Sequence, residues 1–228
     1  MIQFNQILDR MKELANPKAV EGMARFGITT DQTLGVSIPN LRKLAKEIGV
    51  NHELSLKLWS SGFHEARILA GMIDNPNDVT EEQMEVWVKD FDSWDVCDQC
   101  CMNLFDETKL AYQKALEWSG RKEEFTKRAG FVLMACLAVS DKNALDGQFE
   151  QFFPIIQREA IDDRNFVKKA VNWALRQIGK RNLALNRKAV AAAREIAKLD
   201  ARSARWISSD ALRELNSEAV QNRLLRKR

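Results

Sequence analysis

The residues with the clearest chemical potential lie in one short segment and at two distant positions. Residues 93–98 read Ser-Trp-Asp-Val-Cys-Asp, so Trp94 and Asp98 lie one helical turn apart. Arg128 and Trp173 follow in separate segments. If these segments are parallel helices of one array, a carboxylate, a guanidinium and two indoles share one face. Such a set on a basic surface suits chemistry at a cationic sugar–base linkage of DNA.

Each of these side chains also has a purely structural interpretation. Asp98 can be a solvated helix residue or pair with Arg128, and surface pairs of that kind contribute little to stability. Tryptophans at helical spacing usually pack in the core or between repeats. We assign that packing role to the remaining tryptophans, which are Trp59, Trp87, Trp118 and Trp206.

Charge is distributed unevenly along the chain. Residues 165–228 contain 16 Lys or Arg against 5 Asp or Glu, whereas residues 1–164 contain 19 against 27. A basic part of this kind favours a polyanionic partner, most often nucleic acid, over an ordinary lysine- and arginine-rich helical surface. The side chains that we expect to contact the DNA backbone are Lys168, Lys169, Arg176, Lys180 and Arg181.

Four cysteines raise the question of a metal site. Cys97, Cys100 and Cys101 fall within one expected helix, and Cys136 lies one helix away. Structural zinc sites take four ligands, typically from two Cys or His pairs in turns. The spacing therefore favours reduced thiols buried between helices over a zinc site. The sequence also lacks a glycine-rich phosphate loop and a Ser/His/Asp arrangement, and we expect no metal and no cofactor.

Helix signals recur along the chain, and no segment alternates with the period of a strand. Residues 37–49 begin with Ser-Ile-Pro and end on glycine, as helices do. Thr80–Gln83 has the sequence of a capping box. Asn165 can cap a helix that ends at Gly179. We expect breaks at Pro76 and at Pro154.

The helices also recur at a regular pitch. Segments that open on an aromatic begin near Phe63, Trp94, Phe125 and Phe166, at spacings of 31, 31 and 41 residues, and a fifth surrounds Trp206. Each follows another helical segment. This pattern predicts an all-α fold, a curved α-solenoid of HEAT-like repeats whose second helices line a concave groove. The alternative is a compact, irregular helical bundle.

Composition bounds the setting of the protein. We expect a single domain over residues 1–228, with its basic part beginning at about residue 165. No apolar run approaches the roughly 20 residues of a membrane span. Residues 1–6 lack the basic and apolar segments of a secretion signal. We therefore predict a cytoplasmic protein without a membrane partner, and a monomer is the simplest expectation.

Over most of its length the sequence resembles the DNA alkylation repair family of HEAT-like DNA glycosylases, the AlkD-like proteins. The resemblance rests on residues 34–42, residues 63–67, the Trp94–Asp98 motif, residues 125–128 and residues 171–176. It implies a groove that binds duplex DNA carrying alkylated bases. It also implies a monofunctional DNA glycosylase that excises cationic N3- or N7-alkylated purines without flipping the base.

By this resemblance Asp98 is the catalytic carboxylate, and Trp94 and Trp173 contact the backbone around the lesion. Arg128 would hold a phosphate or the carboxylate. An alkylated purine leaves as a neutral base, so the carboxylate has only to stabilise an oxocarbenium-like sugar and orient water. Ser93 stands where the family often has a second tryptophan.

Two other functions stay open from the sequence. The first alternative is a non-catalytic HEAT-like binder of damaged, bent or branched DNA. The second is a protein-interaction scaffold, which is common among α-solenoids. The basic charge near Trp173 argues against a scaffold, which needs no basic groove.

The sequence also departs from the family at one expected contact. The only tyrosine is Tyr112, so a tyrosine contact expected from the N-terminal helices is missing.

Overall fold

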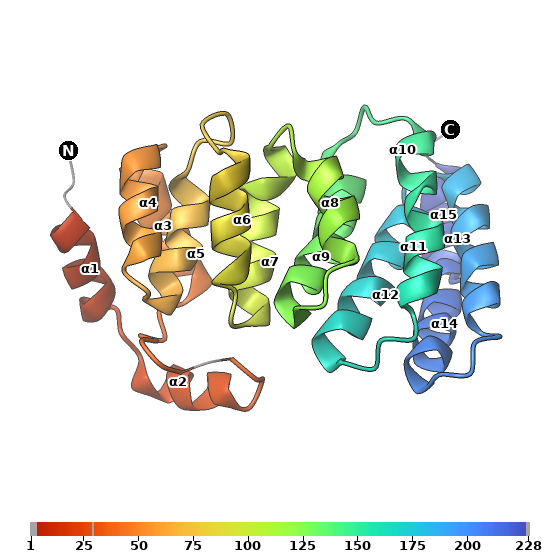
Figure 1. Ribbon diagram of the computed structural model, residues 1–228, viewed down its shortest axis with the longest axis horizontal. Coiled ribbons are helices and arrows are strands. Elements are labelled where there is room, and N and C mark those ends of the chain that lie inside the picture. The colour runs from red at the N-terminus through yellow and green to blue at the C-terminus, as the bar shows by residue number, and fades with distance from the viewer. Residues whose placement is uncertain (1–3, 29, 227–228) are drawn as a thin grey trace. The chain divides into compact units, whose positions relative to one another are not determined.

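The computed structural model describes residues 4–28 and 30–226, which form helices joined by short loops without any strand (Figure 1). These residues fall into two compact units, 1–110 and 111–228. Within the described ranges, none of the helices has the length and apolar character that a membrane crossing requires.

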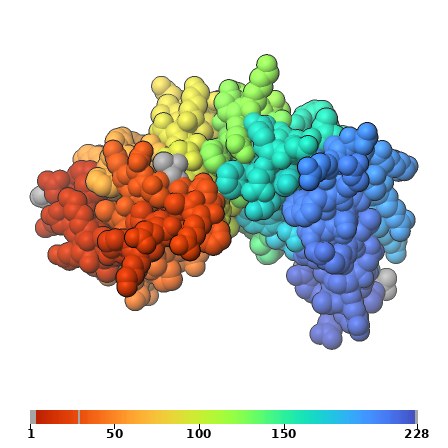
Figure 2. All heavy atoms as spheres, turned by 90° about the horizontal axis from the view of Figure 1, so that it is seen from below, coloured from red at the N-terminus to blue at the C-terminus, as the bar shows by residue number. Residues whose placement is uncertain are grey.

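The first unit contains seven α-helices and one 3-10 helix among its described residues. They are α1 (Phe4–Glu13), α2 (Pro17–Ala24), α3 (Ile38–Ile48), α4 (His52–Ser60), α5 (His64–Ile73), α6 (Glu81–Lys89), α7 (Trp94–Asn103) and η1 (Phe105–Glu107). Helix α2 lies across the ends of its neighbours in Figure 1. The red and orange atoms of α1 and α2 cover this face of the unit in Figure 2.

The second unit contains eight helices among its described residues. They are α8 (Ala111–Ser119), α9 (Glu124–Ser140), α10 (Asp146–Glu150), α11 (Phe152–Glu159), α12 (Asn165–Gly179), α13 (Leu183–Ile196), α14 (Arg202–Leu215) and α15 (Glu218–Leu225). Helices α9, α12 and α14 are the long second helices of successive pairs, and α12 packs against both of the others.

Most of the expected helix ends are confirmed. Gly49 ends α3 with a φ of 73°, and the Thr80 hydroxyl accepts a hydrogen bond from Gln83 N at 3.1 Å at the start of α6. The N-cap of α12 is Arg164, one residue before the expected Asn165. The break expected at Pro154 is wrong. Pro154 lies in the first turn of α11, where its missing N–H breaks no helical hydrogen bond, and the preceding helix ends before Gln151.

The predicted repeat of paired helices is confirmed. Helices α5, α7, α9, α12 and α14 are each preceded by another helix, and they begin where the aromatic-led segments were expected. One pair of those aromatics shows why they recur. The rings of Phe125 and Phe166 lie 5.6 Å apart, so the aromatics at the starts of α9 and α12 pack against each other.

Three of the four tryptophans assigned to packing are buried. Trp59 and Trp87 stack at 3.8 Å between ring centroids with planes 4° apart, and Trp118 is fully buried. The packing role predicted for Trp206 is wrong, because its side chain is 41% exposed. The buried side of α14 carries small and aliphatic residues such as Ala204 and Ile207, and Trp206 projects from another side.

The close approach of α8 and α9 yields a stability prediction. A Cβ added at Gly130 would meet the backbone N of Ser119 well inside 3.0 Å, whereas a Cβ at Gly22 in α2 would meet nothing within 4 Å. We expect Gly130→Ala to lower the free energy of unfolding by about 1–3 kcal/mol because the helices must separate. Gly22→Ala, the matched control, should raise it by roughly 0.5–1 kcal/mol. Denaturant unfolding of both variants tests this, and equal stabilities would contradict it.

Candidate functional site

The first part of the candidate site lies on α7. Trp94 is the first residue of this helix and is half-buried, and Asp98 follows one turn later. The Asp98 side chain is 9% exposed, so it lies beside the apolar side of the helix and does not project into bulk solvent. A carboxylate in such a partly shielded position interacts more strongly with a nearby positive charge than one in open water does.

The indole of Trp94 is held in place by the segment that follows α2. Its Nε1 donates a hydrogen bond to the carbonyl oxygen of Phe26 at 3.2 Å. The Phe26 side chain is itself 70% exposed, so the residue whose carbonyl group binds the Trp94 indole also presents an apolar ring to solvent. Our sequence reasoning missed Phe26. The available signal was an aromatic residue directly before Gly27, which has a φ of 73° and ends the helical segment.

A buried histidine fixes the first turn of α7 to α5. His64 Nε2 and Asp95 Oδ2 lie 2.9 Å apart. Burial opposes the charged form of the imidazole, but the hydrogen bond and the charge of Asp95 outweigh it and raise the pKa of His64. Burial likewise opposes ionisation of Asp95, but its bond to His64 prevails and lowers the pKa of Asp95. The raised pKa of His64 and the lowered pKa of Asp95 make the two groups an ion pair between their usual values of 6.5 and 3.8.

A second buried carboxylate, Glu65, anchors the segment between α2 and α3. It is 1% exposed. Its two oxygens accept hydrogen bonds from the backbone N–H groups of Leu34, Gly35 and Val36 at 2.9, 2.5 and 3.2 Å. Gly35 has a φ of 77°, and a Cβ there would collide with Asn16 O. These hydrogen bonds join residues 34–42 to residues 63–67, the two N-terminal segments on which the family resemblance rests.

Arg128 and Trp173 belong to the second unit. Arg128 on α9 is 6% exposed, and its Nη1 donates to Phe166 O at 2.6 Å, at the start of α12. Trp173 lies midway along α12 and is half-buried. Arg128 therefore links two second helices of its own unit. Asp98 lies in the first unit, and its convergence with Arg128 and Trp173 stays a prediction.

Two of the expected DNA-backbone residues pair with acids of the same unit. Arg176 on α12 contacts Asp210 at 3.6 Å and also pairs with Glu214, and Lys180 Nζ lies 2.5 Å from Glu214 Oε1. Burial opposes ionisation of Glu214, but Lys180 and Arg176 prevail and lower its pKa. Each cation has a side-chain exposure between buried and open, so a phosphate would compete with these acids for it.

Lys168 and Lys169, the other two expected backbone residues of α12, differ in their surroundings. Lys168 Nζ lies 5.7 Å from the centre of the Trp206 ring on α14, a cation–π geometry. Lys169 is exposed, and the described part of the chain gives it no ion pair. Lys168 on α12 therefore lies beside the exposed indole of Trp206 on α14, and the exposed Lys169 follows Lys168 in the same helix. The Trp206 ring is a surface feature that the sequence reasoning had assigned to packing.

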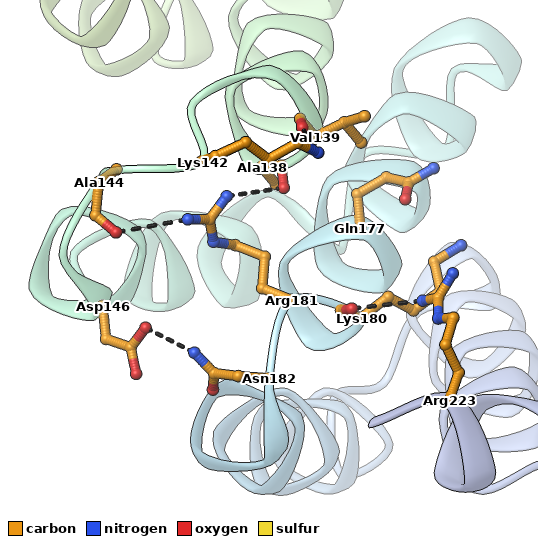
Figure 3. Close-up of a pocket in the computed structure, with 10 residues that line it drawn as sticks. All are labelled: Ala138, Val139, Lys142, Ala144, Asp146, Gln177, Lys180, Arg181, Asn182 and Arg223. Carbon is orange, nitrogen blue, oxygen red and sulfur yellow. Dashed lines mark hydrogen bonds between the residues drawn. The ribbon is translucent and has the colours of Figure 1, made fainter. Parts of the chain in front are cut away.

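Arg181, the fifth expected backbone residue, supports the local fold. Its Nη1 donates to Ala138 O at 2.8 Å and its Nη2 to Ala144 O at 3.3 Å, as Figure 3 shows. Its guanidinium also lies 4.0 Å from the centre of the Phe149 ring. These contacts join the end of α9 to the loop before α10, so Arg181 is fixed by its own unit.

The four cysteines are reduced thiols and all are buried, which confirms the prediction that they pack between helices. Burial raises the pKa of the Cys100 thiol well above its usual value, so this sulfur stays protonated and unreactive. Gly71 on α5 approaches the Cys100 backbone closely, and only small side chains fit there. Among the residues that the structure describes, no group of three or more His, Cys, Asp or Glu side chains is placed to hold a metal ion.

The His64–Asp95 pair leads to a prediction on pH dependence. The raised pKa of His64 means that the pair contributes stability below the usual histidine value of 6.5 and loses it as pH rises through the folded-state pKa. The lowered pKa of Asp95 means that this contribution is also lost in acid, below 3.8. The stability lost in His64→Gln, on the order of 1–3 kcal/mol, should therefore be largest between these values.

Denaturant unfolding of the wild type and of His64→Gln across this pH range measures the difference. Asp95→Asn removes the other partner and should show the same pH window. A stability difference that does not vary with pH in either variant would contradict the ion pair.

A comparison with known protein families gives a match over most of the chain. The model of a family described as "DNA alkylation repair enzyme" matches residues 7–215. The uncharacterized proteins Lin0241 of Listeria innocua and Lmo0209 of Listeria monocytogenes are each 27% identical to this chain over 135 residues. The matched part is 58% of this chain and 60% of each relative, so it spans less than two thirds of their length.

One solved structure resembles almost the whole chain. It covers 98% of this chain and 96% of its own, with a TM-score of 0.80 and 19% sequence identity. It is described as representing a new family of proteins related to the HEAT-like repeat DNA glycosylases with affinity for branched DNA structures. The likeness confirms the predicted all-α fold of HEAT-like repeats.

Proposed function

Because this chain belongs to the family of DNA alkylation repair enzymes, we propose that it binds DNA and hydrolyses the glycosidic bond of purines alkylated at N3 or N7. The observation that carries the proposal is the pair on α7. Asp98 is a shielded carboxylate, and the half-buried indole of Trp94 stands one helical turn before it. A carboxylate in such a position can stabilise the positive charge that develops on a sugar in the transition state.

The reaction needs only a carboxylate and water. The C1′–N9 bond breaks, and its electron pair neutralises the cationic purine, which leaves as a neutral base. The sugar becomes oxocarbenium-like, and Asp98 stabilises its positive charge. A water molecule oriented by Asp98 then attacks C1′ and gives up its proton to that carboxylate. Because the leaving base is already cationic, no general acid has to protonate it.

The DNA backbone would lie along α12 and α14. Lys168 and Lys169 supply cations that phosphates can reach, and Trp173 and Trp206 supply indole faces for sugars or unstacked bases. Arg176 and Lys180 would add charge only after exchanging their carboxylate partners for phosphate. In this proposal Arg128 acts mainly by holding α9 against α12, since it is buried.

The catalytic assignment is tested by Asp98→Asn. Loss of the negative charge should reduce release of 7-methylguanine and 3-methyladenine from methylated duplex DNA by roughly a hundredfold or more. Binding of the same duplex should stay within a few-fold. Chromatography of the free bases measures release. Asp92→Asn, an exposed acid just before α7, is the matched control and should release base like the wild type. Full release by Asp98→Asn would remove the assignment.

The second candidate is a protein that binds branched DNA without cutting a glycosidic bond. It is favoured by the similarity to a solved structure whose description names affinity for branched DNA. The two candidates differ in one experiment. A wild-type protein that releases no base from methylated DNA but binds a three-way junction more tightly than a linear duplex would be a binder.

The α12–α14 ion pairs give a prediction on DNA affinity. Glu214 neutralises part of the charge of Arg176 and Lys180. Glu214→Gln should therefore raise duplex affinity a few-fold at low salt and steepen its salt dependence, because the released cations can bind phosphate. Lys169→Gln should weaken the salt dependence. The magnitude of the negative slope of log K against log salt should fall by about 0.9, the value for one phosphate contact.

Glu195→Gln is the control for these measurements, because Glu195 is an exposed acid of α13 that pairs with Lys198. It makes the same change in net charge at another place. Fluorescence anisotropy over a salt series gives the slopes. If Glu214→Gln behaves like Glu195→Gln, the DNA surface does not include α12 and α14.

A further inference from the structure

The 111–228 unit has a basic cleft in addition to the cations of α12 described above, and Arg128 does not line it. A cleft of about 350 Å³ opens where α9 and α12 end and α13 begins (Figure 3). Its charged and polar lining residues include Lys142, Asp146, Lys180, Arg181, Asn182 and Arg223. Ala138 also lines it and follows Arg128 by ten residues on α9, which corresponds to roughly 15 Å along the helix.

The two arginines of the cleft are held in place by backbone carbonyl groups. Arg181 donates to Ala138 O and Ala144 O, and Arg223 Nη2 donates to Lys180 O at 3.3 Å. A guanidinium carries five N–H donors. These contacts use two donors of Arg181 and one of Arg223. The bonds therefore fix the orientation of both groups and leave donors for a bound molecule.

The one carboxylate among the described lining residues is already engaged. Asp146 Oδ1 accepts a hydrogen bond from Asn182 Nδ2 at 2.7 Å. The Asn182 Oδ1 in turn accepts from Leu185 N at 2.9 Å and caps α13. Asp146 is thus directed toward the amide of Asn182, as the dashed line in Figure 3 shows.

Part of the positive charge serves the helix ends. The C-termini of α9 and α12 each carry about half a negative charge, and the N-terminus of α13 carries about half a positive one. Asp146 and the Glu214 partner of Lys180 remove two more positive charges. Four cationic side chains therefore leave roughly one to two positive charges uncompensated in the cleft. Helix capping alone does not account for all of them.

From this surplus we infer that the cleft binds a phosphate group carried by a larger molecule. Oriented guanidinium groups match the tetrahedral oxygens of phosphate with paired N–H donors. A cleft of about 350 Å³ falls within the range of small-molecule sites and exceeds what a single phosphate fills. The group can come from the DNA backbone, a source that rests on the proposed function, or from a small phosphorylated molecule.

The double variant Lys142→Gln/Arg223→Gln tests the inference. Both side chains are exposed, and neither belongs to the α7 pair or to the α12–α14 surface. The matched control is Arg194→Gln/Arg226→Gln, which removes the same charge from exposed positions outside the cleft. The first measurement is the unfolding midpoint Tm in chloride and in phosphate or pyrophosphate at equal ionic strength. The second is the salt dependence of duplex DNA affinity.

Phosphate or pyrophosphate should raise the Tm of the wild type and of the control, and most of that rise should be lost in the cleft variant. The salt dependence is compared by the magnitude of the slope of log K against log salt. If this magnitude is also smaller for the cleft variant than for the control by about one to two, the phosphate is that of DNA. A smaller slope magnitude in the cleft variant also assigns the phosphate to DNA when free phosphate does not change the Tm. Loss of the Tm response with an unchanged slope assigns the cleft to a small phosphorylated molecule.

The inference is overturned if the cleft variant and the control match in both measurements. The Tm measurement contains no DNA, so its outcome is independent of whether Asp98 supports base release. A failure of the proposed function is therefore distinguishable from a failure of the cleft.

Discussion

The structure of the first unit depends on the hydrogen bonds that the buried carboxylate of Glu65 accepts from the chain after α2. A charge this deeply buried is strongly destabilising unless it is fully hydrogen-bonded. Here three consecutive backbone N–H groups, from Leu34 to Val36, supply that compensation. The bonds fix the chain after α2, and the neighbouring His64 fixes the start of α7 through Asp95. Trp94 itself is held by its hydrogen bond to Phe26 O and by the His64–Asp95 pair next to it, so the candidate catalytic face owes its geometry to groups that need not touch a substrate.

The second unit uses charge in a different way. Its pairs between α12 and α14 are partly exposed, and pairs of that kind each contribute little to stability. Their main effect is to set the direction of long side chains and to lower the free charge of the surface. A DNA phosphate must compete with Asp210 and Glu214 for Arg176, so affinity reflects the difference between two sets of ion pairs. Counting lysines and arginines in the sequence therefore overestimates the positive charge that such a surface offers to DNA.

The sequence predicted the features that depend on local signals. Helix ends, paired helices and buried cysteines follow from capping residues, proline positions and small side chains within a few residues of one another. The pairs that build the site lie one repeat apart, and local signals do not reveal them. Glu65 meets Leu34, and His64 meets Asp95, across 31 residues, and Arg176 meets Glu214 across 38. Residues one period apart lie side by side in a helical repeat protein. Testing the sequence for complementary charges at the repeat period is the signal that would have found them. Trp206 was misassigned because its spacing alone does not tell which side of α14 faces the core.

The shielded position of Asp98 also bears on the choice between enzyme and binder. A carboxylate close to a DNA backbone repels phosphates, and partial burial strengthens that repulsion along with every other interaction of the charge. For DNA affinity alone, such a group beside the backbone is unfavourable. An enzyme gains because the positive charge on the sugar exists mainly in the transition state, so the attraction lowers the barrier more than it weakens binding. If DNA lies against α7, the catalytic role that we propose for Asp98 therefore accounts for a carboxylate beside Trp94 better than a role in affinity does.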